Sequence, residues 1–183
     1  VFTAQNDKNS ASICSGALSI TTLQTYFELA EHSKHTYERE NRSLDVFLLD
    51  IVVRRLLAVE RVLTSTGDAS IPGAKNTNLL LLGRPGSGRR TCVALAAHMA
   101  GFQLFTPEKS TKDGYSLKSF KSELKQFIAT TCFESTPSVL FIEDHHFTAG
   151  GAEVVEVLNS LLSSNEVAGL FTNEELESGL APA

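Results

Sequence analysis

Apolar residues recur along the chain with two different spacings, one typical of helices and the other of buried strands. Four stretches have the three- to four-residue spacing of an amphipathic helix, and they lie at about 20–34, 46–63, 116–128 and 153–164. Three short runs are almost wholly apolar, as buried parallel strands are, and they lie at 79–82, 102–105 and 138–142. Strands that alternate with helices in this order predict an α/β fold with a parallel sheet covered by helices.

Two helix starts are marked by capping residues. Ser43 is predicted to be the N-cap of the 46–63 helix, with Asp45 in the first turn, where a carboxylate is favoured. Near the C-terminal end, Thr172 is followed by Glu175 three residues later. This is the capping-box pattern, in which each side chain bonds the other residue's backbone N–H, and it predicts one more short helix.

The first 42 residues differ in character from the rest. Residues 1–16 are small and polar without periodicity, so we expect a loose lead. Residues 37–42 are mostly charged and are expected to form a solvated connector or an exposed helix face. We therefore divide the chain into an N-terminal polar lead with a helical connector, 1–42, and an α/β module, 43–183.

A glycine-rich turn, Gly83-Arg84-Pro85-Gly86-Ser87-Gly88, follows the first apolar run and leads into a helical pattern. Gly83 and Gly88 have the spacing of the phosphate-binding loop G-x-x-x-x-G-K-[ST]. In such a loop the backbone N–H groups must surround phosphate oxygens, and side chains would block them. The positive end of the following helix adds attraction for the anion. The sequence predicts phosphate binding here, and the alternative is a strand-to-helix turn that binds nothing.

The loop departs from this pattern at its two chemical positions. Arg89 stands where the lysine is expected, and its planar guanidinium keeps the charge but not the shape of an ammonium group. Arg90 stands where a magnesium-binding Ser or Thr is expected, and it offers no oxygen to a metal. Thr91 carries a hydroxyl one position later. These residues predict nucleotide binding without efficient hydrolysis.

A second chemical position, Glu143-Asp144, follows the third apolar run. P-loop ATPases carry acids at such a strand end, usually in the order Asp-Glu, to hold Mg²⁺ and to orient the attacking water. The order here is reversed, and a shift of about 1 Å in a catalytic group can cost on the order of 100-fold in rate. We expect Glu143 to face Mg²⁺ and the pair to be weak catalysts, the alternative being an acidic strand end in solvent. The adjacent His145-His146 are interpreted as structural, because they lack companion metal ligands.

Composition excludes several classes of function. A net charge of −5 argues against a general nucleic-acid binder. No apolar run approaches the roughly 20 residues that cross a bilayer, so we expect no membrane partner. Cys14, Cys92 and Cys132 are odd in number and lack metal-ligand spacing, which is typical of reduced thiols. Because the chain starts at Val1 rather than methionine, we expect it to be a piece of a longer protein.

Three stretches together resemble dynein heavy chains, and among these the fourth AAA+ module of the cytoplasmic dynein 2, or intraflagellar transport, type. They are the segment 37–45 with the helix end at 59–63, the loop GRPGSGRRT, and the segment NSLLSSNEVAGLF at 159–171. The resemblance implies a P-loop AAA+ three-layer sandwich with sheet order 5-1-4-3-2. This chain would supply the first three strands only, so we expect an incomplete parallel sheet and poor stability in isolation. It also implies that 83–91 is the Walker A loop, that 138–144 is the Walker B-like segment, and that 46–47 lies near the adenine.

The function that the resemblance implies is a regulatory ATP-binding module of a minus-end-directed microtubule motor. ATP or ADP, with Mg²⁺, would bind at the loop, and hydrolysis would be slow or absent. The implied partners are the neighbouring AAA+ modules, the dynein intermediate and light intermediate chains, and microtubules. The implied location is the cytoplasm, the cytoskeleton and the cilium. Two alternatives stay open: a nucleotide-free structural segment of the ring, and an active AAA+ remodelling ATPase.

Overall fold

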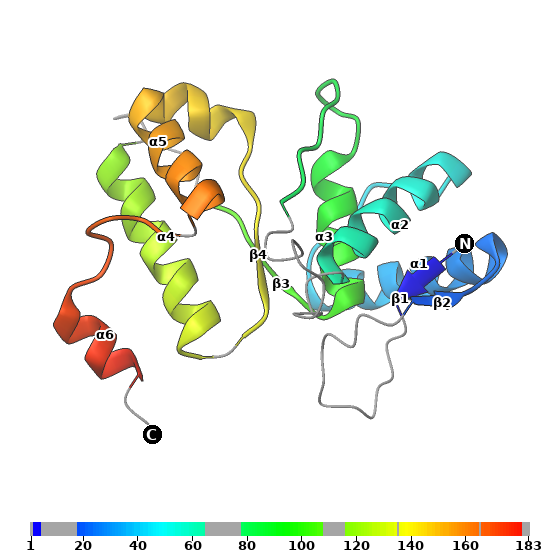
Figure 1. The fold of residues 1–183 in the computed structure, drawn as a ribbon. Coiled ribbons are helices and arrows are strands. Elements are labelled where there is room, and N and C mark those ends of the chain that lie inside the picture. The colour runs from blue at the N-terminus through cyan, green and yellow to red at the C-terminus, as the bar shows by residue number, and fades with distance from the viewer. Residues whose placement is uncertain are drawn as a thin grey trace. The chain divides into compact units, whose positions relative to one another are not determined.

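The computed structural model describes residues 2–4, 18–64, 78–107, 116–134, 136–164 and 166–180. The chain forms two compact units, residues 1–102 and residues 103–183, and each has a hydrophobic core of its own (Figure 1). Within the described residues no helix is both long and apolar enough to cross a membrane.

The described part of the N-terminal unit contains three helices and one pair of strands. The helices are α1 (Leu23–Glu40), α2 (Asp50–Thr64) and α3 (Arg89–Ala100), and the strands are β1 (Phe2–Ala4) and β2 (Leu18–Ile20). The two strands pair antiparallel, which the expectation of a loose lead missed; residues 5–17 lie outside the described part of the chain. Every residue from 92 to 97 of α3 is buried, and this run of small and apolar side chains places α3 inside its unit.

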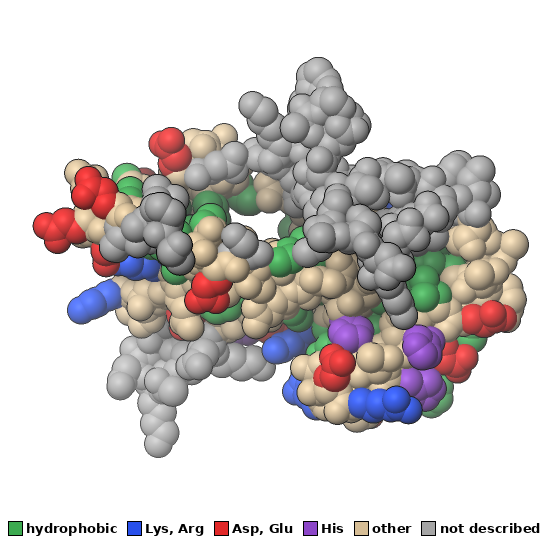
Figure 2. All heavy atoms as spheres, turned by 90° about the horizontal axis from the view of Figure 1, so that it is seen from below, with side chains coloured by type: hydrophobic (Ala, Val, Ile, Leu, Met, Phe, Trp, Pro, Cys, Tyr) green, Lys and Arg blue, Asp and Glu red, His purple; other side chains and the backbone are tan. Residues whose placement is uncertain are grey.

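Helix α1 is longer than its apolar pattern predicts. It begins after the N-cap Thr22, whose side chain accepts the N–H of Thr25 at 3.1 Å. It continues through the charged residues to Glu40, so these form a helix face rather than a connector. Figure 2 shows histidine side chains beside acidic and basic ones on this unit, at the right of the view. Charges of both signs are interspersed on this part of the surface.

The predicted start of the second helix is wrong. Helix α2 begins at Asp50 rather than at 46, so Ser43 is not its N-cap and Asp45 is not in its first turn. Two side chains of α1 hold the preceding segment in a non-helical form. Lys34 Nζ donates to the carbonyl of Val46 at 2.9 Å, and the N–H of Leu44 donates to Glu38 Oε1 at 3.0 Å. The backbone groups that would open a helix are thus bonded to another element.

The C-terminal unit contains a parallel sheet of two strands, β3 (Gln103–Phe105) and β4 (Ser138–Leu140), in which Leu104 pairs with Val139. The resemblance places the second and third strands side by side, and this pairing confirms it. The helices are α4 (Leu117–Cys132), α5 (Asp144–Ser164) and α6 (Asn173–Leu180). Helix α5 is interrupted at Gly151, whose φ of 66° is outside the helical region.

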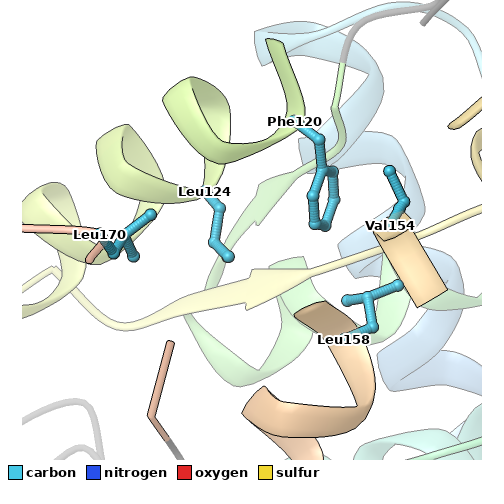
Figure 3. Packing of buried hydrophobic residues seen from close by; sticks show 5 residues of the cluster. All are labelled: Phe120, Leu124, Val154, Leu158 and Leu170. Atoms are coloured by element: carbon cyan, nitrogen blue, oxygen red, sulfur yellow. The ribbon is translucent and has the colours of Figure 1, made fainter. Parts of the chain in front are cut away.

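The core of this unit lies between α4 and α5. Figure 3 shows Phe120 and Leu124 of α4 directed toward Val154 and Leu158 of α5, with Leu170 beside them. The first four side chains are at most 6% exposed, which confirms the apolar faces predicted for both helices. The predicted capping box is also present. The N–H of Thr172 donates to Glu175 Oε2 at 2.9 Å, and the N–H of Glu175 donates to Thr172 Oγ1 at 3.3 Å.

The prediction of a buried strand at 79–82 is wrong for this structure. Residues 78–84 have no regular structure, and Leu80 and Leu82 are 80% and 83% exposed. A parallel strand forms only when its backbone groups bond neighbouring strands. In the sheet order implied by the resemblance, the neighbours of this run are the fourth and fifth strands. The described residues contain no strand that pairs with it, so the sheet is incomplete at this point.

Candidate nucleotide-binding site

The glycine-rich loop leads directly into helix α3. Gly86 and Gly88 have φ values of 79° and 77°, a region that L-amino acids with side chains rarely adopt. The N–H of Ser87 donates to the carbonyl of Arg84 at 3.1 Å and closes the turn. Gly88 is the N-cap of α3 and contributes no side-chain capping bond, while its carbonyl accepts the N–H of Cys92 at 2.9 Å. The loop therefore presents the N-terminus of α3 without a side chain over it at Gly88.

Gly83 is required by a close approach rather than by its backbone angles. A Cβ at this position would lie 2.8 Å from Ser87 Oγ and 3.5 Å from Ser87 Cβ. The hydroxyl of Ser87 is buried, and it has no hydrogen-bond partner among the described residues. A buried hydroxyl without a partner is costly in a folded protein unless a ligand or water completes it. A phosphate oxygen is an acceptor of the kind that this hydroxyl lacks, so the loop fits a nucleotide phosphate.

The three arginines of the loop differ in their surroundings. Arg84 and Arg90 are exposed, whereas Arg89 is half-buried. Arg89 Nη1 donates to the carbonyl of Leu81 at 3.4 Å, which is a long hydrogen bond. The guanidinium therefore lies beside the segment that enters the loop. Thr91 is half-buried in the first turn of α3, so its hydroxyl is held close to the loop.

A buried polar contact joins α1 to α2 in the unit that carries the loop. Tyr26 of α1 donates its hydroxyl to Glu60 Oε2 of α2 at 2.7 Å, and both residues are at most 4% exposed. Burial, and next the charge of Glu60, raise the pKa of Tyr26 far above its ordinary value, so the phenol stays protonated. Cys92 lies in the same core, and its burial raises the pKa of its thiol against the opposing effect of Arg55. Cys92 and Cys132 are free thiols, as predicted, and Cys14 lies outside the described residues.

The acidic pair follows the end of strand β4. The ladder continues one step past the strand, because the N–H of Phe141 donates to the carbonyl of Phe105 at 2.8 Å. The side chain of Glu143 is 25% exposed, and Asp144 is exposed at the first position of α5. A carboxylate is favoured at a helix N-terminus, so the position of Asp144 has a structural reason as well as a chemical one.

The two histidines after the acids contact Glu143. His146 is completely buried, with Nδ1 at 3.1 Å from the N–H nitrogen of Glu143 and Nε2 at 3.1 Å from the carbonyl oxygen of Pro107. Its structural role is therefore confirmed. His145 Nδ1 lies 3.8 Å from Glu143 Oε2, and the two imidazole rings are in contact with their centroids 3.9 Å apart and their planes tilted by 36°. The sequence analysis missed these contacts with the acid, although the two histidines directly follow it.

The loop and the acidic pair belong to different units, the loop to residues 1–102 and the acids to residues 103–183. Among the described residues no group of three or more His, Cys, Asp or Glu side chains is arranged to hold a metal ion. Mg²⁺ commonly binds through one or two carboxylates together with substrate phosphates. Glu143 offers a carboxylate of the kind that this mode uses, and its side chain is 25% exposed.

Comparisons with known proteins cover both the loop and the acidic pair. A family model described as P-loop containing dynein motor region D4 matches residues 44–181, which include the loop and the acidic pair. Cytoplasmic dynein 2 heavy chain 1 of Tripneustes gratilla is 40% identical over 167 residues, which are 91% of this chain and 4% of that protein. The heavy chain of the same name from Homo sapiens is 43% identical over 146 residues, 80% of this chain and 3% of that protein. The heavy chain of the same name from Chlamydomonas reinhardtii is 40% identical over 158 residues, which are 86% of this chain and 3% of that protein. This chain thus spans about 3–4% of the length of these relatives.

Proposed function

The chain belongs to the family of the P-loop containing dynein motor region D4, and from this premise we propose that it binds ATP or ADP as part of a dynein-type motor heavy chain. The resemblance to the cytoplasmic dynein 2 heavy chain is confirmed by the identities of 40–43%. The wider proposal is a minus-end-directed motor of intraflagellar transport, in the cytoplasm, the cytoskeleton and the cilium. Its partners would be the neighbouring AAA+ modules, the intermediate and light intermediate chains, and microtubules.

The observation that carries the proposal is the closed geometry of the loop. Ser87 Oγ lies 2.8 Å from where a Cβ of residue 83 would stand, and it is buried without a partner in the described part of the chain. Gly86 and Gly88 turn the backbone through positive φ on either side of it. Main-chain N–H groups arranged in this way, at the start of a helix, form an anion-binding concavity. These features support binding of the nucleotide phosphates by residues 83–91.

Slow or absent hydrolysis follows from the residues at the chemical positions. Arg90 supplies no oxygen for a metal, and Arg89 is directed toward the carbonyl of Leu81. Glu143 and Asp144 stand in reversed order, and Glu143 is in contact with His145. A metal-side acid and a water-orienting acid must each be placed to within about 1 Å, because larger errors cost on the order of 100-fold in rate. We assign Glu143 to Mg²⁺ and expect little turnover from the pair.

Titration with a fluorescent ATP analogue tests the proposal. The motor region of the full heavy chain is used, with the phosphate-binding loops of the other modules inactivated. Saturable binding is expected, and Arg89→Ala is expected to weaken it by about 10- to 100-fold, because a charge-assisted hydrogen bond contributes about 1.5–3 kcal/mol. Arg54→Ala is the matched control, because Arg54 is exposed on α2 and pairs with Asp50 at 2.8 Å. It removes the same charge from the same unit and should leave the affinity unchanged.

The two alternatives give different results in the same experiment. A nucleotide-free structural segment would show no saturable binding at millimolar analogue, and this result would refute the proposal. An active AAA+ remodelling ATPase would show turnover at this site that falls on Asp144→Asn. Binding without turnover is the expected outcome.

A further inference from the structure

His146 is the most buried polar side chain among the described residues of the C-terminal unit, and nucleotide binding at the loop assigns it no role. It is 0% exposed. Burying an imidazole is unfavourable unless both ring nitrogens are bonded. Both are bonded here, and the two bonds join different segments of the chain.

The contacts of the ring fix one of its protons. A carbonyl oxygen can only accept, so Nε2 carries a proton and donates it to the carbonyl of Pro107 at 3.1 Å. Nδ1 lies 3.1 Å from the backbone nitrogen of Glu143 and 3.2 Å from its carbonyl oxygen. In the tautomer with its proton on Nε2 alone, Nδ1 accepts the N–H of Glu143. The backbone adds a third bond, from the N–H of His146 to the carbonyl of Glu143 at 3.0 Å.

The ring stands where the two parallel strands end. Pro107 comes two residues after the end of β3, and Glu143 comes three residues after the end of β4. The last ladder bond joins Phe141 to Phe105 at 2.8 Å, and beyond it the imidazole links the two segments again. In open α/β sheets ligands bind outside the carboxyl ends of the strands. His146 therefore fixes the backbone at the edge where the acidic pair stands.

We propose that His146 is the positioning residue of the acidic pair: its ring bridges Pro107 and Glu143 and so sets where the Glu143 carboxylate stands for magnesium nucleotide. This inference rests on the proposed nucleotide-binding function. His145 adds a contact with the side chain of Glu143. Its ring contacts that of His146, with centroids 3.9 Å apart and planes tilted by 36°, and its Nδ1 lies 3.8 Å from Glu143 Oε2. The order of the acids is unusual, and this bridge gives the first of them a fixed position.

The bridge itself is tested by hydrogen-exchange mass spectrometry on the heavy-chain motor region, with overlapping peptides that resolve the Glu143 amide. His146→Ala should speed exchange of this amide about fivefold or more, because it removes a hydrogen bond of ordinary strength. His146→Asn should retain protection, because its Oδ1 stands near the position of Nδ1 and accepts the same N–H. Val154→Ala is the control, because Val154 is equally buried in this unit and has no bond to Glu143. Equal exchange in wild type and His146→Ala would overturn the proposal.

The consequence for the site is tested by the ratio of the ATP-analogue dissociation constants measured without and with Mg²⁺. His146→Ala should reduce this ratio to nearly one, and His146→Asn should restore it only in part, because it keeps the bond to Glu143 but does not reach Pro107. Val154→Ala should lower the melting temperature without changing the ratio, which separates positioning from general stability. A wild-type ratio that His146→Ala leaves intact would overturn the proposal. A wild-type ratio of one would refute Mg²⁺ binding at Glu143, and the exchange result would still decide the bridge.

Discussion

Replacing Gly83 by alanine tests how the nucleotide loop is closed. The new Cβ would stand 2.8 Å from Ser87 Oγ, about 0.6 Å inside the 3.4 Å at which ordinary contact begins. The serine side chain can rotate, at a cost of about 0.5–1.5 kcal/mol for leaving its rotamer. Against this, alanine stabilises by about 0.4–1 kcal/mol through the unfolded chain. Gly83→Ala should therefore change the local free energy of unfolding by less than about 1 kcal/mol, but it moves the buried hydroxyl out of its position.

A double variant separates the steric clash with Ser87 from the effect of alanine on the unfolded chain. In Gly83→Ala/Ser87→Ala the nearest atom to the new Cβ is the Cβ of residue 87 at 3.5 Å, which is an ordinary contact. The cycle of two single variants and the double variant should thus show a coupling of about 1 kcal/mol, favourable to the double variant. Local unfolding free energies come from hydrogen exchange of peptides covering the loop and α3. Additive effects within about 0.3 kcal/mol would refute the close approach.

Three further predictions concern other contacts. Gly88→Ala and Gly101→Ala introduce a side chain at the two ends of α3, where φ is 77° and 75°. Each substitution should lower the stability of α3 by about 1–2 kcal/mol. Only Gly88→Ala should also weaken ATP-analogue binding in a titration. Tyr26→Phe should lower the stability of α1 and α2 by about 1–3 kcal/mol in hydrogen exchange, because it removes the 2.7 Å bond to a buried carboxylate, and unchanged exchange would contradict this. The pKa of Glu175 is lowered from 4.5 to about 2, first by the hydrogen bond from Lys125. The ionised Glu175 carboxylate therefore stabilises α6 above about pH 4.5, and this stabilisation is lost as the pH falls toward 2. Lys125→Met should make the stabilisation smaller and move its loss to higher pH, in exchange measurements corrected for the intrinsic rate.

The parts of the fold that the sequence predicts correctly are those set by neighbouring residues. The capping box of Thr172 and Glu175 depends on a spacing of three residues, and the structure has both of its bonds. The start of α2 depends instead on α1, because Lys34 and Glu38 bond the backbone at residues 44–46. A pattern within 43–50 contains no sign of those contacts. The run 79–82 is apolar enough for a strand, but a strand also requires a neighbouring strand to pair with. The pattern of apolar residues indicates only that a segment tends to be buried.

In the candidate site, too, the sequence predicts features set by neighbouring residues and misses contacts between distant ones. The spacing of Gly83 and Gly88 predicts the loop, and the positive φ of Gly88 agrees with it. The hydroxyl of Ser87 beneath Gly83 is a contact across the turn, which the spacing alone does not contain. His146 was recognised as structural, but its bond to Pro107 crosses 39 residues of sequence. Contacts of this range follow from the pairing of β3 with β4, and that pairing was inferred from the resemblance rather than from the residues.

The exposed leucines ahead of the loop have a consequence for biosynthesis. Leu80 and Leu82 are 80% and 83% exposed, and no described residue after them, up to 180, forms a strand against them. Ribosomes add about 5–20 residues per second, so the roughly 98 residues from 83 to 180 take on the order of 5–20 s to emerge. Throughout that interval this apolar segment stays exposed to water on the nascent chain. Apolar segments exposed during synthesis are prone to aggregate, so shielding by a chaperone in that interval would favour correct folding of this segment.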